Sequence, residues 1–137
     1  MTTIEVVRTF DATPKALWAC VRAFGDVPWI GGGPLEVRGE GVGQVRIFER
    51  PSGLLHEQLT SLHDATRTLT YAIPVGMPFP ASTYESTMTV AGDRGRGRLS
   101  WSGRFEPEEG ASAAAISEQI QRGYGAVMDR LAEHLKG

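Results

Sequence analysis

The sequence predicts a single α+β domain, residues 1–137, in which a seven-stranded antiparallel sheet wraps around a long C-terminal helix. From Leu35 to Phe105, short alternations of apolar and polar residues are separated by turn residues about every ten positions, which is typical of an antiparallel meander. The last stretch, Ser112–Lys136, repeats apolar residues at three- and four-residue steps, which is typical of a helix with one buried face. Two short helices are predicted between the first strand and the meander.

The elements before the meander follow from local signals. Residues Thr3–Phe10 alternate as a strand does, and a proline after a threonine N-cap predicts a helix over Pro14–Phe24. A second short helical turn is predicted over Asp26–Ile30. The following run, Gly31–Gly33, lacks the lysine and the helix of a phosphate-binding loop. Trp29, between a proline and these glycines, is either a core residue or an aromatic wall at the mouth of a pocket.

The meander contains six predicted strands, separated by glycine- and proline-containing turns. They are Leu35–Arg38, Val42–Glu49, Leu54–His63, Thr66–Pro74, Ala81–Val90 and Arg98–Glu106. The connection Pro74–Pro80 is longer and proline-rich, which is typical of a rim loop. The arginines in Gly92–Gly97 mark either a solvated hairpin tip or a small basic binding patch.

The C-terminal helix carries an apolar stripe that must be covered by the sheet. The stripe contains Ile116, Ile120, Gly123, Tyr124, Val127, Leu131 and Leu135. Gly123 and Gly125 are unusual there, because each costs about 1 kcal/mol relative to alanine in a helix interior. Two interpretations of Gly123 are open: close packing against a bulky core side chain, or a helix that lines a cavity and leaves room for a ligand.

Strand parity separates the inward-facing residues from the outward-facing ones. The inward set of the last three strands is Leu69, Tyr71, Ile73, Tyr84, Ser86, Met88, Val90, Leu99, Trp101, Gly103 and Phe105. Glu57 falls on the same face as Leu55 and Leu59, and a buried carboxylate needs a partner. A two-residue Pro51-Ser52 loop would place Arg46 directly opposite Glu57. The alternative is that both charges lie on an exposed sheet face.

Composition and charge exclude several classes of function. The chain has 14 Lys+Arg against 16 Asp+Glu, so a nucleic-acid partner is not expected. Its single cysteine, Cys20, allows no internal disulfide, and the N-terminus has no signal-peptide pattern, so a cytoplasmic protein is expected. No apolar stretch is long enough to span a membrane.

Catalytic metal or nucleophile chemistry has little support in the sequence. The three histidines, His56, His63 and His134, are far apart, and one cysteine cannot form a zinc cluster, so no metal or cofactor is expected. Cys20 lies in a predicted helix without a histidine nearby, and no G-x-S-x-G motif occurs. Cys20 is therefore interpreted as a small packing residue.

The order of elements and a succession of motifs resemble a known superfamily. The motifs are Trp18 to Phe24-Gly25, Trp29, Gly41-Val-Gly43-Gln-Val-Arg46, Glu57 with Leu59 and Asp64, Tyr71, Pro80, Tyr84, and Trp101 with Phe105. Over nearly its whole length the chain resembles the polyketide cyclase/dehydrase and lipid-transport group of the START-like superfamily, also called SRPBCC or birch pollen allergen-like proteins. The fold of this superfamily is the helix-grip arrangement. The stretch Ile30–Pro34 departs from the usual pattern, so contacts that relatives make there are not carried over.

The resemblance implies a hydrophobic pocket between the sheet and the last helix, but relatives include aromatase/cyclases, lipid carriers and hormone receptors. The expected ligand-binding residues are Trp29, Tyr71, Tyr84, Met88, Trp101, Phe105, Gly123 and Tyr124, and the candidate catalytic residues are Glu57, Arg46 and Tyr71. One hypothesis is a monomer or homodimer that binds a small hydrophobic or polyketide-like molecule. The other is a cyclase or dehydratase in which Arg46 or a tyrosine holds an enolate oxygen while Glu57 transfers a proton.

Overall fold

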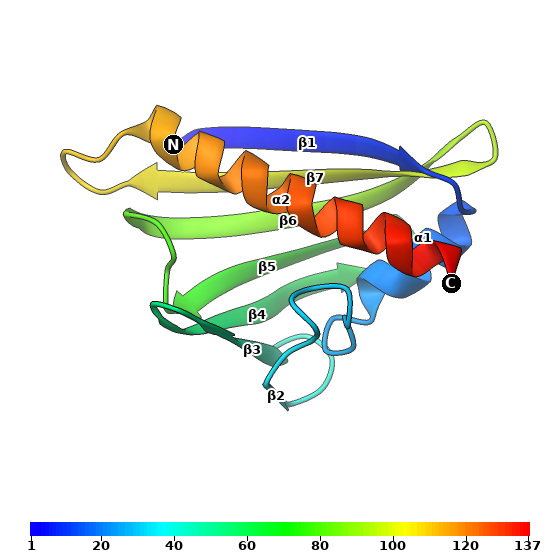
Figure 1. The fold of residues 1–137 in the computed structure, drawn as a ribbon, viewed down its shortest axis with the longest axis horizontal. Coiled ribbons are helices and arrows are strands. Elements are labelled where there is room, and N and C mark those ends of the chain that lie inside the picture. The colour runs from blue at the N-terminus through cyan, green and yellow to red at the C-terminus, as the bar shows by residue number, and fades with distance from the viewer.

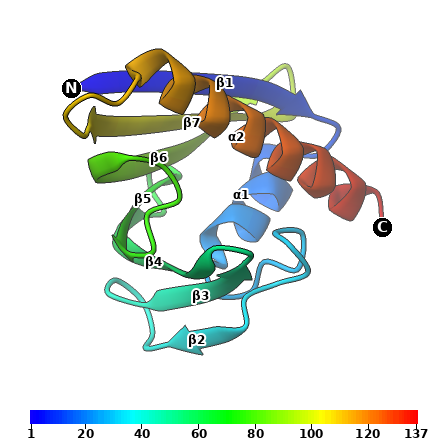
Figure 2. The ribbon, with the colours of Figure 1, turned by 60° about the vertical axis from the view of Figure 1, so that its left-hand side comes forward.

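A computed structural model describes residues 1–137 as an antiparallel sheet curved around a long helix (Figure 1). The elements are β1 (Thr2–Phe10), α1 (Pro14–Arg22), β2 (Glu36–Arg38), β3 (Val45–Arg50), β4 (Gly53–His63), β5 (Thr68–Val75), β6 (Ala81–Asp93), β7 (Arg96–Pro107) and α2 (Ala113–Lys136). The seven strands follow the order β1-β7-β6-β5-β4-β3-β2. The predicted helix-grip α+β class is confirmed. Figure 2 shows how the sheet bends, so that β2 and β3 lie well away from β1 and α2.

The second short helix was a wrong prediction. Residues 28–32 form consecutive turns, in which the Ile30 N–H donates to the Val27 carbonyl at 3.0 Å and the Gly33 N–H donates to the Ile30 carbonyl at 2.8 Å. Pro28 has no N–H to donate. The backbone then takes φ angles of 56°, 82° and 101° at Gly31–Gly33, a left-handed conformation that cannot continue a right-handed helix.

Several strand boundaries differ from the predictions for a similar reason. The third strand begins at Val45 and not at Val42, because Gly41 enters a turn with φ of 61°. The hairpin between β6 and β7 is tighter than predicted, since its turn contains only Arg94 and Gly95, with φ of 54° and 84°. Positive φ at both central residues matches the twist of a two-residue hairpin, so both strands run further than expected.

The predicted faces of the strands are confirmed by burial. The inward-facing residues of β7, from Leu99 to Phe105, alternate with exposed or partly exposed neighbours. The register between β3 and β4 also follows the prediction: Arg46 pairs with Glu57, and the turn between the strands contains only Pro51 and Ser52. The apolar residues of the inner face and the helices form one continuous core.

Helix α2 crosses the concave side of the sheet and packs against β1 and β7. The Ser112 side chain caps its N-terminus by accepting the Ala115 N–H at 3.1 Å. Its core face buries Ile116, Ile120, Tyr124, Met128 and Leu131. No helix of the chain combines the length and apolar character that a membrane crossing requires.

Candidate functional site

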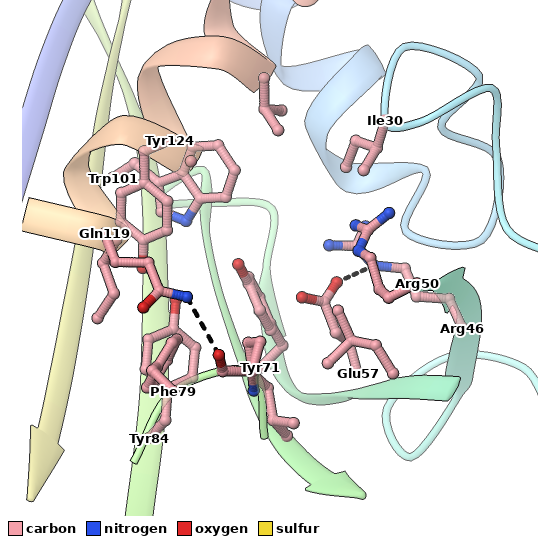
Figure 3. Close-up of a pocket in the computed structure, with 16 residues that line it drawn as sticks. Ile30, Arg46, Arg50, Glu57, Tyr71, Phe79, Tyr84, Trp101, Gln119 and Tyr124 are labelled. Atoms are coloured by element: carbon pink, nitrogen blue, oxygen red, sulfur yellow. Dashed lines mark hydrogen bonds and ion pairs between the residues drawn. The ribbon is translucent and has the colours of Figure 1, made fainter. Parts of the chain in front are cut away.

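A pocket of about 270 Å³ lies between α2 and the inner face of the sheet (Figure 3). The apolar part of its lining is Ile30, Leu55, Ile73, Pro78, Phe79, Trp101, Ile120, Gly123 and Val127, and the polar part is Arg46, Arg50, Glu57, Tyr71, Tyr84, Gln119 and Tyr124. Small-molecule pockets commonly have volumes of about 300–1,000 Å³, so this one suits a small ligand.

The ion pair between Arg46 and Glu57 forms one wall of the pocket. The Arg46 Nε donates to Glu57 Oε1 at 2.9 Å, and the two side chains are only 3% and 13% exposed. The Arg46 Nη1 donates to the Phe24 carbonyl at 3.0 Å, and its guanidinium lies 3.9 Å from the centre of the Phe24 ring. The interpretation of an exposed pair is therefore wrong, and the predicted buried pair is confirmed.

A cluster of hydroxyl groups forms the opposite side of the pocket. The Trp101 Nε1 donates to Ser86 Oγ at 2.7 Å, and Ser86 in turn donates to the Ser102 carbonyl at 3.0 Å. The Tyr124 hydroxyl is hydrogen-bonded to Ser86 Oγ at 3.1 Å and also to the Tyr84 hydroxyl. The Trp101 and Tyr124 rings stack with 4.1 Å between their centres. This arrangement leaves a flat aromatic surface whose buried polar atoms are paired with one another.

Gly103 allows this cluster to form. It lies in β7 beneath the two tyrosines, and a Cβ atom at this position would be 2.7 Å from the Tyr124 hydroxyl oxygen and 3.1 Å from a ring carbon of Tyr84. Such distances are shorter than normal packing contacts. A glycine at this inward position therefore lets both hydroxyl groups approach the strand.

Burial raises the pKa of every tyrosine in the chain. The pKa of Tyr71 is raised well above its usual range, first by burial and then by the negative charge of Glu57. Burial also raises the pKa of Tyr84 well above its usual range and that of Tyr124 to about 12. All three hydroxyls are therefore neutral at neutral pH and can donate hydrogen bonds to a ligand.

Tyr71 connects the hydroxyl cluster to the Glu57 side of the pocket: burial and then the charge of Glu57 raise the pKa of its hydroxyl, and a hydrogen bond with Ser86 lowers it. The residue is only 2% exposed. Figure 3 shows the hydroxyl pointing into the open part of the pocket, with the Glu57 carboxylate beside it. Tyr71 and Glu57 thus present a donor and an acceptor to the same space.

Gly123 faces open space and not a core side chain. It lines the pocket, and a Cβ atom at this position would meet no heavy atom within 4 Å. The interpretation of Gly123 as a close-packing residue is therefore wrong. The absence of a side chain here widens the pocket on the side of α2.

The structure brings most of the predicted site residues together. Those that line the pocket are Arg46, Glu57, Tyr71, Tyr84, Trp101, Gly123 and Tyr124. Trp29, Met88 and Phe105 belong to the closed core and do not line it. Ile30 occupies the position expected for Trp29, and Phe79, whose ring centre lies 6.4 Å from that of Phe105, lines the pocket in place of Phe105.

The sequence-based prediction missed two polar residues of the lining, Arg50 and Gln119. Arg50 has the same strand parity as Arg46, so its orientation could have been inferred. The Gln119 Nε2 donates to the Pro78 carbonyl at 3.1 Å and ties α2 to the predicted rim loop, a long-range contact that has no local signal. This loop also provides Phe79 and closes one end of the pocket.

A family model described as polyketide cyclase/dehydrase and lipid transport matches residues 1–136. The chain belongs to this family. The predicted membership of the START-like, or SRPBCC, superfamily is confirmed by this match and by the fold. No curated protein sequence shows a significant match to this member of the polyketide cyclase/dehydrase family.

Solved structures share the fold at low sequence identity. A protein from Thermobifida fusca, solved by NMR, is 23% identical and gives a TM-score of 0.84 over 98% of this chain and 93% of its own. An uncharacterised protein from Bacillus thuringiensis is 22% identical, with a TM-score of 0.81 over 99% of this chain and 100% of its own. Ara h 8.0201 is 19% identical, with a TM-score of 0.77 over 99% of each chain. At these identities the similarity shows the fold alone.

Proposed function

We propose that the protein binds a small apolar or aromatic molecule in the pocket between α2 and the sheet. The observation that supports this proposal most strongly is the open space beside Gly123, which lines the pocket on the side of α2. Gly125 of the same helix also has no neighbour within 4 Å but does not line the pocket, whereas Gly123 leaves room in the pocket that a ligand can fill.

The chemistry of the lining supports an aromatic ligand. The stacked Trp101 and Tyr124 rings and the ring of Phe79 offer flat surfaces, and offset stacking of aromatic rings contributes about 0.5–1.5 kcal/mol beyond area burial. Tyr71 and Glu57 supply one donor and one acceptor that can orient a polar substituent. A mostly apolar pocket with a few directed polar groups is the usual form of a small-molecule site.

A second function, acid-base catalysis on a carbonyl compound, is favoured by the position of Tyr71 beside Glu57. The Tyr71 hydroxyl could hold a carbonyl oxygen and stabilise the enolate that forms when Glu57 removes a proton from the adjacent carbon. Arg46 would then be a positioning residue, because its guanidinium is already bonded to Glu57 and to the Phe24 carbonyl. The family description, polyketide cyclase/dehydrase and lipid transport, includes both classes of function.

A pair of matched variants tests the binding proposal. Gly123→Leu places a side chain in the pocket, whereas Gly125→Leu adds the same side chain to the same helix at a position that does not line it. Both changes replace a glycine in α2, and each gains about 1 kcal/mol of helix propensity. We expect Gly123→Leu to weaken binding of the small neutral dye 1-aminoanthracene at least tenfold, measured by fluorescence titration, and Gly125→Leu to leave it unchanged. Equal affinities in the two variants would contradict the proposed site.

The two functions differ in their response to Glu57→Gln. In a binding protein this change alters ligand affinity, and it also lowers stability because Arg46 loses its charged partner. In a cyclase or dehydratase it removes the base, so turnover of a β-keto substrate would be lost while the substrate still binds.

A further inference from the structure

Arg50 is a charged residue of the pocket for which the structure shows no counter-ion. Five of the twelve arginines form salt bridges, namely Arg8, Arg22, Arg38, Arg46 and Arg122. Among the seven that form none, Arg50 is the one that lines the pocket. Arg50 is nevertheless partly buried, and its only marked contact is with the Phe48 ring, whose centre lies 5.2 Å from the guanidinium carbon. A guanidinium that is partly removed from water favours a position beside a negative charge.

Arg50 lies at the edge of the pocket, next to the glycine-rich loop Gly31–Gly33. Its Nη1 atom lies 3.4 Å from the point where a Cβ of Gly31 would be, so a side chain at position 31 would touch the guanidinium. Figure 3 shows Arg50 below Ile30, across the pocket from Trp101 and Tyr124. The glycine at position 31 keeps one side of the guanidinium accessible.

The charges of the lining do not balance. Two guanidinium groups, those of Arg46 and Arg50, face a single carboxylate, that of Glu57. Arg46 and Glu57 neutralise each other at 2.9 Å, and the tyrosines are neutral at neutral pH because burial raises the pKa of each hydroxyl. The remaining net positive charge is that of Arg50.

We propose that the ligand is a small aromatic acid, whose carboxylate binds Arg50 at the edge of the pocket and whose ring lies against Trp101 and Tyr124. This inference rests on the proposed binding function and specifies its ligand class. The planar fork of a guanidinium matches the two oxygens of a carboxylate, and such a pair is stronger than a neutral hydrogen bond. Tyr71 and Glu57 lie between Arg50 and the two stacked rings, so they can bind a neutral polar substituent on the ligand's ring.

Two probes with the same ring and different charge test the inference. At pH 7, 2-naphthoate is an anion and 2-naphthamide is neutral, while their size and shape are nearly the same. We expect the protein to bind 2-naphthoate about tenfold more tightly than the amide in calorimetric titrations, since a guanidinium binds an ionised carboxylate more strongly than a neutral carbonyl. The preference should fall with rising salt concentration, because Arg50 is partly exposed.

Variants of Arg50 separate the charge from other effects. Arg50→Gln should remove the preference for the acid and leave amide affinity unchanged, while Arg98→Gln, at an exposed position on β7, should change neither. Arg50→Lys keeps the charge but not the planar fork, so it should retain part of the preference even if the glutamine variant folds poorly. Equal binding of both probes by the unmodified protein would overturn the inference and leave the binding proposal intact. If neither probe binds, the binding proposal fails and the inference fails with it.

Discussion

Removal of the Arg46 guanidinium is the mutation whose effect the structure defines most completely. Arg46 is 2% exposed, donates to Glu57 at 2.9 Å and to the Phe24 carbonyl at 3.0 Å, and lies over the Phe24 ring. Arg46→Met keeps much of the side-chain volume but leaves the Glu57 carboxylate and the Phe24 carbonyl without these partners. Both groups then lose hydrogen bonds that water cannot readily replace.

The expected cost follows from these lost interactions. Breaking one partner of a buried ion pair commonly costs about 3–5 kcal/mol, and we expect Arg46→Met to lower the free energy of unfolding by this amount. For a domain of this size the loss corresponds to a decrease in Tm of about 10–20 °C. The double variant Arg46→Met/Glu57→Met should recover much of the loss, because it leaves no unpaired charge.

Urea unfolding followed by circular dichroism measures these free energies, provided that the slope of the transition is the same in all variants. Arg98→Met, at an exposed position, is the matched control and should cost no more than about 0.5 kcal/mol. A cost for Arg46→Met of about 1 kcal/mol or less, as for a surface pair, would refute the reasoning. It would mean that the guanidinium is hydrated, and Glu57 would no longer be a candidate acid-base residue.

Two further predictions concern the tyrosine side of the pocket. The pKa values of the three tyrosines are raised in the folded protein, so tyrosinate absorbance at 295 nm should stay flat as the pH passes 10 and rise only near 12. The free energy of unfolding should fall over this pH range, because the tyrosines of the unfolded chain ionise first. If a tyrosine of the folded protein titrates near pH 10, the claim that all three tyrosines are buried is wrong. Gly103→Ala should displace Tyr124 from its hydrogen bonds and cost about 1–3 kcal/mol, and a smaller effect in the same urea assay would show that the strand adjusts.

The features that follow from short-range rules could be predicted from the sequence. Strand parity depends only on the alternation of side chains, so it identified the inward faces of β6 and β7 correctly. The pairing of Arg46 with Glu57 was predictable because a two-residue turn determines the register of both strands. The long C-terminal helix followed from its apolar stripe and its N-cap.

The features that depend on several elements at once could not be predicted in the same way. Parity places Met88 and Phe105 on the inner face, but it cannot tell which inward residues are covered by other side chains and which border open space. The role of Gly123 was ambiguous because the sequence does not show what faces a helix glycine. The turns at residues 28–32 were misjudged because Pro28 and the glycines after it outweigh the helical tendency of neighbouring residues.

The most direct test of the central claim is a crystal structure of the protein with 1-aminoanthracene at saturating concentration. The claim predicts density for the ring system between α2 and the sheet, beside Gly123 and against the stacked rings of Trp101 and Tyr124. Density for the dye only on the outer surface, with the pocket filled by rearranged side chains, would contradict it.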